Sequence, residues 1–111
     1  MKRNPEFTAG LSELVVLRLL SEREMYGYEL AKSVQSRARD QIRLGEGLLY
    51  PLLHELEVRG LLRSRRALFN GRTRIYYRVS ARGKQRLAQL LDRWRRASSA
   101  VSDVLGEIRH A

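Results

Sequence analysis

Residues 63–78 contain six arginines, placed on both sides of an Asn70-Gly71 pair. A guanidinium group is a planar, permanently charged donor whose geometry matches the oxygens of a phosphate or a carboxylate. Tyr50 and His54, a little earlier in the chain, add side chains that can donate or accept hydrogen bonds. These residue types predict the recognition of a polyanion rather than the turnover of a substrate.

The charge of the chain is uneven along its length. All 111 residues together have 22 Lys and Arg against 12 Asp and Glu, a net charge of +10. Residues 1–58 have 8 basic and 9 acidic side chains, whereas residues 59–111 have 14 basic and 3 acidic ones. Such an asymmetry indicates that one face meets a polyanion, which could be nucleic acid, an anionic membrane or an acidic protein.

Few residues suit catalysis or metal binding. The chain has no cysteine, which excludes a disulfide framework, a thiolate zinc site and a cysteine nucleophile, and its two histidines are His54 and His110. Glu55 and Glu57 are two residues apart and therefore point to different sides of a helix. No nucleophile–base–acid set and no glycine-rich phosphate loop is present, so the sequence predicts no enzyme, no cofactor and no metal.

The arginines are expected on a two-stranded antiparallel ribbon. The apolar period changes from helical to two after Leu62, and Asn70-Gly71 is a strong hairpin signal. Residues 73–79 are rich in β-branched and aromatic side chains, which favour a strand. We expect Tyr77 on one face of the ribbon and Arg74 on the other.

Three helices are predicted before the ribbon, over about residues 9–20, 26–37 and 47–58. Residues 1–8 are expected to form a flexible arm, with Thr8 as the first N-cap. The third helix has Pro51 in its first turn, where proline is tolerated, and ends before Gly60. Its core stripe consists of Leu49, Leu52, Leu53 and Leu56, and the opposite face carries Tyr50, Pro51, His54 and Val58.

A long last helix is predicted from the N-cap Ser80 to near Ile108. Its apolar residues repeat about every 3.5 positions over three heptads, and such a helix is too long for this small domain to bury. We therefore expect it to pair with the same helix of a second copy. The predicted dimer residues are Leu87, Leu90, Leu91, Trp94, Val101, Val104, Leu105 and Ile108.

Three helices followed by a basic hairpin is the order of a winged helix-turn-helix. The predicted fold is mainly α with a small β-hairpin: an arm (1–8), a DNA-binding domain (9–79) and a C-terminal dimerisation helix (80–111). In such proteins the second helix of the motif enters the major groove, and an arginine-bearing wing tip follows the backbone or enters the minor groove. The candidate DNA-contacting residues are Gly47, Leu48, Tyr50, Pro51, His54, Arg63, Arg65, Gly71, Arg72 and Arg74.

Several linked segments, in order and covering about residues 10–105, resemble the PadR family of bacterial transcription regulators. They are residues 25–30 (MYGYEL), 47–57 (GLLYPLLHELE), 60–62 (GLL) and 76–83 (YYRVSARG). The single last helix is similar to that of the shorter PadR subfamily. The resemblance implies a homodimer that binds a near-palindromic operator of double-stranded DNA, usually as a repressor that a small-molecule effector releases.

The resemblance also assigns roles to individual positions. Gly47, Tyr50 and Pro51 match the recognition segment of the family. The wing of the family is matched by Gly71, Arg74, Tyr76 and Tyr77. Trp94 matches an aromatic residue common in the last helix, which makes it the candidate for an effector pocket near the dimer interface.

The chain departs from the family pattern at three positions. Leu48 stands where the family usually has Thr or Ser, Glu55 where a basic residue is common, and Arg72 where proline is common. The missing hydroxyl at Leu48 favours an alternative, in which the winged helix binds an acidic protein instead of DNA. A membrane-surface role is the weakest alternative, because no aromatic and aliphatic face accompanies the basic residues.

Two further expectations concern location. No secretory h-region follows Lys2 and Arg3, and the longest aliphatic run, residues 14–17, is far too short to span a bilayer. These features predict a cytoplasmic protein, or a nuclear one if the source has a nucleus, without a membrane partner. Tyr26 and Tyr28 are expected in the core, as aromatic residues in so short a motif usually are.

Overall fold

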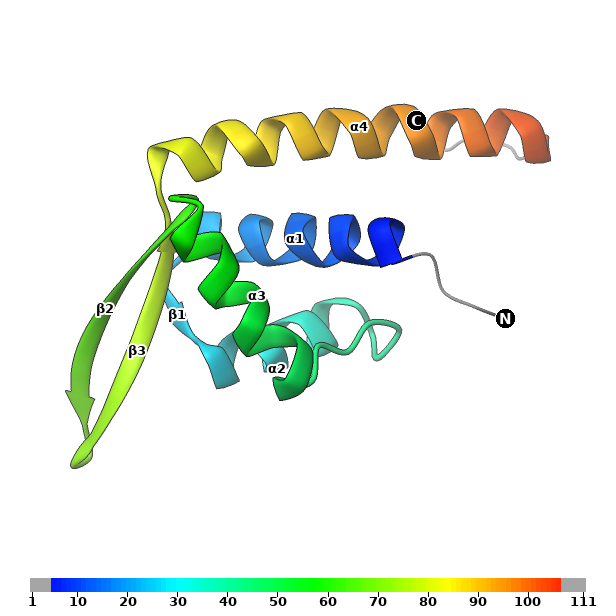
Figure 1. Ribbon diagram of the computed structural model, residues 1–111. Helices are drawn as coiled ribbons and strands as arrows, with labels where there is room; N and C mark the ends of the chain where they lie inside the picture. The colour runs from blue at the N-terminus through cyan, green and yellow to red at the C-terminus, as the bar shows by residue number, and fades with distance from the viewer. Residues whose placement is uncertain (1–4, 107–111) are drawn as a thin grey trace.

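The computed structural model describes residues 5–106, and side chains from Gly10 onward. The elements follow in the order α1 (Pro5–Glu22), β1 (Met25–Tyr26), α2 (Gly27–Arg37), α3 (Glu46–Val58), β2 (Leu62–Phe69), β3 (Arg72–Val79) and α4 (Ala81–Leu105) (Figure 1). This order confirms the predicted fold class, three helices with a β-hairpin wing and a long last helix. Within the described residues, no helix combines the length and apolarity that crossing a membrane requires.

The ribbon forms as predicted and gains a third strand. β2 and β3 pair antiparallel from Leu62↔Val79 to Phe69↔Arg72, and the turn between them has positive φ at Asn70 (50°) and Gly71 (76°). Two consecutive positive φ angles are what a two-residue type I′ hairpin requires. β1 pairs with the other side of β3, so the order is β1-β3-β2. With only two residues, β1 is too short to show a period in the sequence.

The starts of α1 and α3 differ from the predicted ones. α1 begins at Pro5 rather than Ala9, so Thr8 is not its N-cap and the described part of the predicted arm is helical. Proline suits a first helical position because its N–H would have no partner there. α3 begins at Glu46, which places Pro51 in the second turn rather than the first. Residues 1–4 of the arm and Ile108 and His110 lie outside the described residues.

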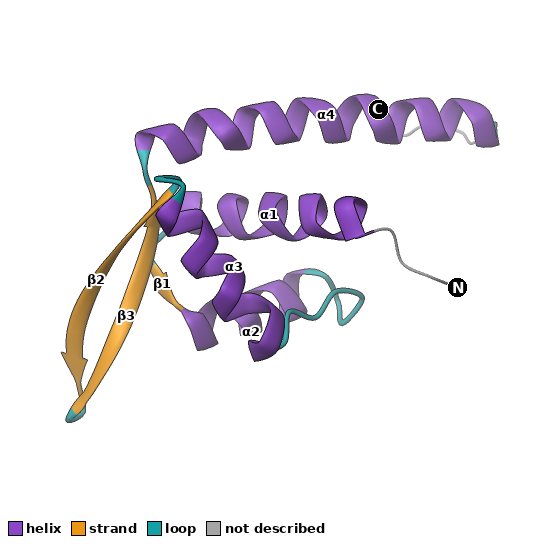
Figure 2. Cartoon of the chain, viewed as in Figure 1, coloured by secondary structure: helices purple, strands orange, loops and turns teal. Residues whose placement is uncertain are grey.

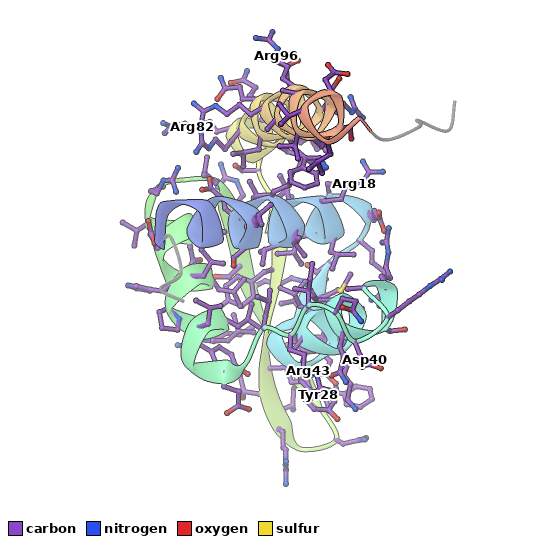
Figure 3. All side chains as sticks on the ribbon, turned by 90° about the vertical axis from the view of Figure 1, so that its right-hand side faces the viewer. Arg18, Tyr28, Asp40, Arg43, Arg82 and Arg96 are labelled. Atoms are coloured by element: carbon purple, nitrogen blue, oxygen red, sulfur yellow. The ribbon has the colours of Figure 1, made fainter. Side chains whose placement is uncertain are left out.

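α1 is the centre of the molecule. It lies between α4 on one side and α2 with α3 on the other, as two perpendicular views show (Figures 1 and 3). Val16 and Leu17 of α1 are fully buried, as are Leu30 of α2 and Leu53 of α3. Contact on both sides explains why the apolar residues of α1 occur nearly all round the helix.

α4 runs alongside α1 in the opposite direction (Figures 1 and 2). Its N-cap is Ser80, as predicted: the hydroxyl accepts from the Gly83 N–H at 3.0 Å and donates to the Gly60 carbonyl at 2.6 Å. Gly83 packs so closely that a Cβ there would lie 2.1 Å from the Leu61 carbonyl oxygen. The start of α4 is therefore joined tightly to the base of the wing.

The first half of α4 belongs to the core of the chain. Leu87 and Leu90 are each 7% exposed and join the core cluster, and Leu91 packs against it half-buried. This corrects the prediction that Leu87 and Leu90 lie in the dimer interface, because α1 already covers them. The periodicity correctly located the apolar stripe of α4, but the first half of that stripe is buried within a single subunit.

Candidate nucleic-acid interface

The face of α3 opposite the core is open to solvent. Leu49, Leu53 and Leu56 point inward, whereas Leu48 and Tyr50 are 45% and 46% exposed. The other predicted contacts on this helix, Gly47, Pro51 and His54, are exposed as well. The structure therefore gathers all five predicted α3 residues on the accessible side of one helix.

Tyr50 is held in place by the start of α2. A Cβ on Gly27 would lie 2.8 Å from Cε1 of Tyr50, so the ring rests directly on the backbone of that residue. Gly27 is the first residue of α2. The sequence identified Tyr50 as an exposed side chain, and the structure adds that one side of its ring packs against Gly27.

The wing offers four exposed arginines that form no ion pair with another described residue. They are Arg63 and Arg66 on β2, Arg72 beside the turn, and Arg78 on β3. Exposed guanidinium groups at the edge of a ribbon are suited to phosphate oxygens. Gly71, also among the predicted contacts, is exposed at the turn between the two strands.

Arg65 is already occupied within the chain. It donates to both carboxylate oxygens of Glu24, at 2.8 and 2.5 Å, and its guanidinium lies 4.9 Å from the centre of the Tyr76 ring. The hydrogen bond from Arg65 holds the pKa of the Glu24 carboxyl below its usual range. The sequence grouped Arg65 with the DNA-contacting arginines, but its first role in the structure is to tie the wing to the segment before β1.

Arg74 is stacked between two aromatic rings. Its guanidinium lies 4.3 Å from the ring centre of Tyr26 and 4.5 Å from that of Phe69, and the side chain is half-buried. Cation–π contacts of this kind fix the orientation of the guanidinium plane. Arg74 therefore joins the wing to the start of α2, a contact that the sequence did not predict.

The expectation that Tyr26 and Tyr28 are core residues is wrong. Tyr28 is 57% exposed, and Lys32 lies over its ring at 5.5 Å. Tyr26 is half-buried at the root of the wing, where it meets Tyr76 edge to face at 5.5 Å. Tyrosine suits such partly exposed sites because its apolar ring can pack against the protein while its hydroxyl contacts water.

The tip of the wing lies at the end of the molecule away from α4, whereas the base of the wing, with Arg63, adjoins the start of α4 (Figure 1). In Figure 3, Tyr28 and Arg43 lie toward the end where the wing projects, while Arg82 and Arg96 lie on α4 at the opposite end. Sequence reasoning missed Tyr28 and Arg43. The periodicity assigned Tyr28 to a helix but not to a face, and Arg43 lies in the α2–α3 loop, where no period exists.

A cavity of about 280 Å³ separates α3 from the wing. Tyr50 closes it from α3, and Thr73, Arg74 and Tyr77 close it from β3. Burial raises the pKa of the Tyr77 phenol, which therefore stays protonated and can donate a hydrogen bond. Hydrogen-bond donors on Tyr50, Thr73, Arg74 and Tyr77 therefore form part of the cavity lining.

Trp94 lies on the α1–α4 seam, 43% exposed. It lines two cavities of about 340 and 180 Å³, and Leu14 of α1 borders both of them. Farther along α4, Val101, Val104 and Leu105 are exposed. Of the predicted dimer residues, these three and Trp94 are accessible in the described part of the chain.

No metal centre is visible in the part of the chain that the structure describes. Residues 5–106 contain no cluster of three or more His, Asp or Glu side chains that could hold a metal ion. The chemistry of the candidate surface is that of guanidinium, phenol and imidazole groups facing solvent.

Comparison with known proteins identifies the family. Residues 16–89 match the transcriptional regulator PadR-like family. Transcriptional regulator Rv3488 of Mycobacterium tuberculosis is 34% identical over 105 residues, which cover 95% of this chain and 92% of that protein. A PadR family transcriptional regulator from Eggerthella lenta superposes with a TM-score of 0.78 at 32% identity, covering 90% of this chain and 86% of the other.

A more distant structure supports the fold alone. A transcriptional regulator from Clostridium thermocellum superposes with a TM-score of 0.81 at 24% identity, covering 88% of this chain and 96% of its own. With two thirds of the sequence inside the family match and a relative of similar length, the chain belongs to the PadR-like family of transcriptional regulators.

Proposed function

We propose that this chain is a homodimeric repressor that binds a near-palindromic operator in double-stranded DNA. α3 enters the major groove, and the wing follows the phosphate backbone beside it. The two α3 helices of a dimer then meet successive major grooves about 34 Å apart. A two-fold symmetric protein reads a two-fold symmetric site, which is why the operator is near-palindromic.

One observation carries this proposal: Tyr50 of the exposed α3 face and Thr73, Arg74 and Tyr77 of the wing line the same cavity, and the exposed Arg72 precedes Thr73 on the same strand. Arg63, Arg66 and Arg72 neutralise phosphates and supply affinity that is independent of sequence. Tyr50 and His54 meet base edges and supply selectivity. Arg65 and Arg74 hold the wing at the angle at which the other arginines reach the backbone.

The exposed stripe on the second half of α4 supports dimerisation. Val101, Val104 and Leu105 are 55%, 86% and 62% exposed, although they continue the stripe that α1 covers farther upstream. A row of exposed apolar residues at helical spacing is typical of an interface. The proposed occupant is the same stripe of a second copy.

The proposed effector site lies around Trp94. The smaller cavity that Trp94 lines lies between α1 and α4, and the larger one is also bordered by α2; both lie next to the proposed pairing stripe. A small apolar or aromatic molecule bound there would shift α4 relative to α1. Such a shift changes the separation of the two α3 helices and releases the operator.

A salt titration by fluorescence anisotropy tests DNA binding. If a dimer contacts about 6–10 phosphates, its affinity for a selected duplex falls by about 10³–10⁵ between 50 and 200 mM salt. A flat salt response contradicts the proposal. A protein that shifts no fragment of the source genome but retains an acidic protein in a pull-down would instead fit the alternative that the apolar Leu48 favours.

A matched pair of variants separates affinity from selectivity. Tyr50→Ala is expected to reduce the difference between the selected and a random duplex by about tenfold, since a good base contact contributes that much discrimination. Arg63→Ala is expected to weaken both duplexes alike, because phosphates are the same in every sequence. Equal effects of the two variants on selectivity would contradict the roles assigned to α3 and the wing.

A further inference from the structure

Glu13 of α1 is the one acidic side chain that is buried among the residues whose side chains are described. Its side chain is 10% exposed, and its Oε1 atom accepts from Nη2 of Arg59 at 3.3 Å and from Nε of Arg86 at 2.9 Å. Arg59 is the C-cap residue of α3, and Arg86 lies on α4. A single carboxylate oxygen therefore connects three helices.

Glu13 is the nearest acidic partner of Arg59 and of Arg86; Arg59 also lies 3.8 Å from Glu55 of its own helix, whose side chain is 63% exposed. The side chains of Arg59 and Arg86 are 39% and 24% exposed, so water screens them only in part. Removing the charge of Glu13 would leave Arg86 without this ion pair and Arg59 with only the longer contact to Glu55, which is unfavourable at a partly buried site. Without the charge of Glu13, the guanidinium groups of Arg59 and Arg86, which both contact its Oε1 atom, would repel each other.

We propose that Glu13 is a positioning residue that fixes the angle between α3 and α4. This inference rests on the proposed function for its consequence: α4 joins the two subunits, so the angle between α4 and α3 sets the distance between the two α3 helices. Half-site spacing follows from that distance. Glu13, which lies on the far side of the core from DNA, thus selects the operator spacing that the dimer accepts.

The first test measures geometry without DNA. The chain has no cysteine, so His54→Cys on α3 and Ala100→Cys on α4 provide two unique sites for nitroxide labels. Labelled protein is diluted with unlabelled protein so that only distances within one subunit are measured by pulsed electron paramagnetic resonance. One narrow distance distribution is expected for this labelled background, and a broadened or shifted one after adding Glu13→Gln.

The matched control is Glu22→Gln. Glu22 also pairs with two arginines, Arg18 and Arg37, but it links α1 to α2 and forms no ion pair with a described residue of α3 or α4. Arg86→Gln serves as a second variant in case Glu13→Gln does not fold, because it detaches α4 while Glu13 keeps Arg59. The expected result is a changed α3–α4 distance with Arg86→Gln and an unchanged one with Glu22→Gln. Unchanged distances in both Glu13→Gln and Arg86→Gln overturn the proposal.

The second test measures spacing. Half-sites selected from random duplexes by the wild-type protein are placed at separations that differ by one base pair, and binding is measured for each. Glu13→Gln and Arg86→Gln are expected to lose about tenfold of the preference for the wild-type spacing, or 1.4 kcal/mol. Equal weakening at every spacing would show a merely structural role and overturn the proposal. If the wild type selects no duplex, the proposed function fails, whereas the distance measurement still decides the role of Glu13.

Discussion

The wing and α4 contain six basic side chains each, but they use them differently. The wing projects away from α4, and some of its arginines, such as Arg65, form an ion pair within the chain, whereas others, such as Arg72, do not. On α4, Arg86 is bound to Glu13 and Arg96 to Asp92. Net charge therefore predicts a polyanion as partner, but only contacts show which arginines are available to it.

The largest expected effect comes from the apolar stripe of α4 rather than from its charges. Val104→Asp places a carboxylate in the proposed dimer interface, so the two subunits separate and each half-site is bound alone. We expect operator affinity to fall by about 10²-fold or more, because the second contact is no longer held at high effective concentration. Sedimentation velocity and anisotropy measure the two effects together.

Ala88→Asp is the control for that variant, since it adds the same charge to an exposed position on the first half of α4. It is expected to leave the dimer intact. A Val104→Asp protein that remains dimeric at micromolar concentration would contradict the assigned interface and would remove the contrast between the two halves of α4.

A smaller effect is expected from a wing arginine. Arg72→Ala removes an unpaired charge, so affinity falls several-fold for operator and random DNA alike, and the slope of log affinity against log salt becomes shallower by about one. Arg96→Ala on α4 removes a charge at the opposite end and is expected to leave the slope unchanged. If both variants change the slope equally, the distinction between wing and α4 is wrong.

Glu24→Gln is expected to act in the opposite direction. It releases Arg65 and removes a negative charge next to the wing, so non-specific affinity rises a few-fold and the salt slope steepens by about one. A matched Glu29→Gln variant changes an acidic residue that pairs with Arg23 outside the wing and is expected to leave the slope unchanged. A Glu24→Gln protein with weaker binding to random DNA would contradict this account.

The pH dependence of stability provides a second test of the contact between Arg65 and Glu24. The hydrogen bond from Arg65 lowers the pKa of Glu24 from its ordinary value of 4.5. The stability that this contributes is present above pH 4.5 and is lost as the pH falls through the lowered folded-state pKa. Thermal unfolding below pH 4.5 should therefore depend less on pH in Glu24→Gln than in the wild type, and parallel curves for the two proteins would contradict it.

The smallest expected effect belongs to the stack around Arg74. Phe69→Leu removes one of its two rings without changing any charge, which weakens a contact of about 0.5–1 kcal/mol at an exposed site. We expect about a two- to threefold loss of DNA affinity and an unchanged salt slope, both measured by anisotropy. A change of slope would show that Phe69 controls a phosphate contact rather than the rigidity of the wing.

Sequence periodicity predicted most of the fold, because the helices and the hairpin are governed by local rules. The leucine stripe of α3, the Asn70-Gly71 turn and the Ser80 cap each follow from residues close to one another in the chain. β1 and the start of α1 were missed or misplaced, since a two-residue strand has no period and the N-terminal segment shows no apolar repeat. The partition of the α4 stripe between core and surface depends on α1, which is distant in sequence.

The sequence predicted which residue types form the candidate site, but it did not predict the role of each residue equally well. Exposure of Tyr50 and His54 follows from their position opposite a leucine stripe. The roles of Arg65 and Arg74 depend on Glu24, Tyr26 and Phe69, and no local pattern reveals a pair that is 41 positions apart, as Glu24 and Arg65 are. The same holds for Glu13, whose two partners lie 46 and 73 positions away.

The close contact at Gly83 has a mechanical consequence. Even a methyl group at this position would meet the Leu61 carbonyl oxygen at 2.1 Å and the Val79 Cγ1 atom at 2.6 Å, and backbone at such a distance has to move. The first turn of α4 and the base of the ribbon therefore form a rigid junction rather than a hinge. A rotation of α4 is therefore expected to move the arginine-bearing strands β2 and β3 together with it.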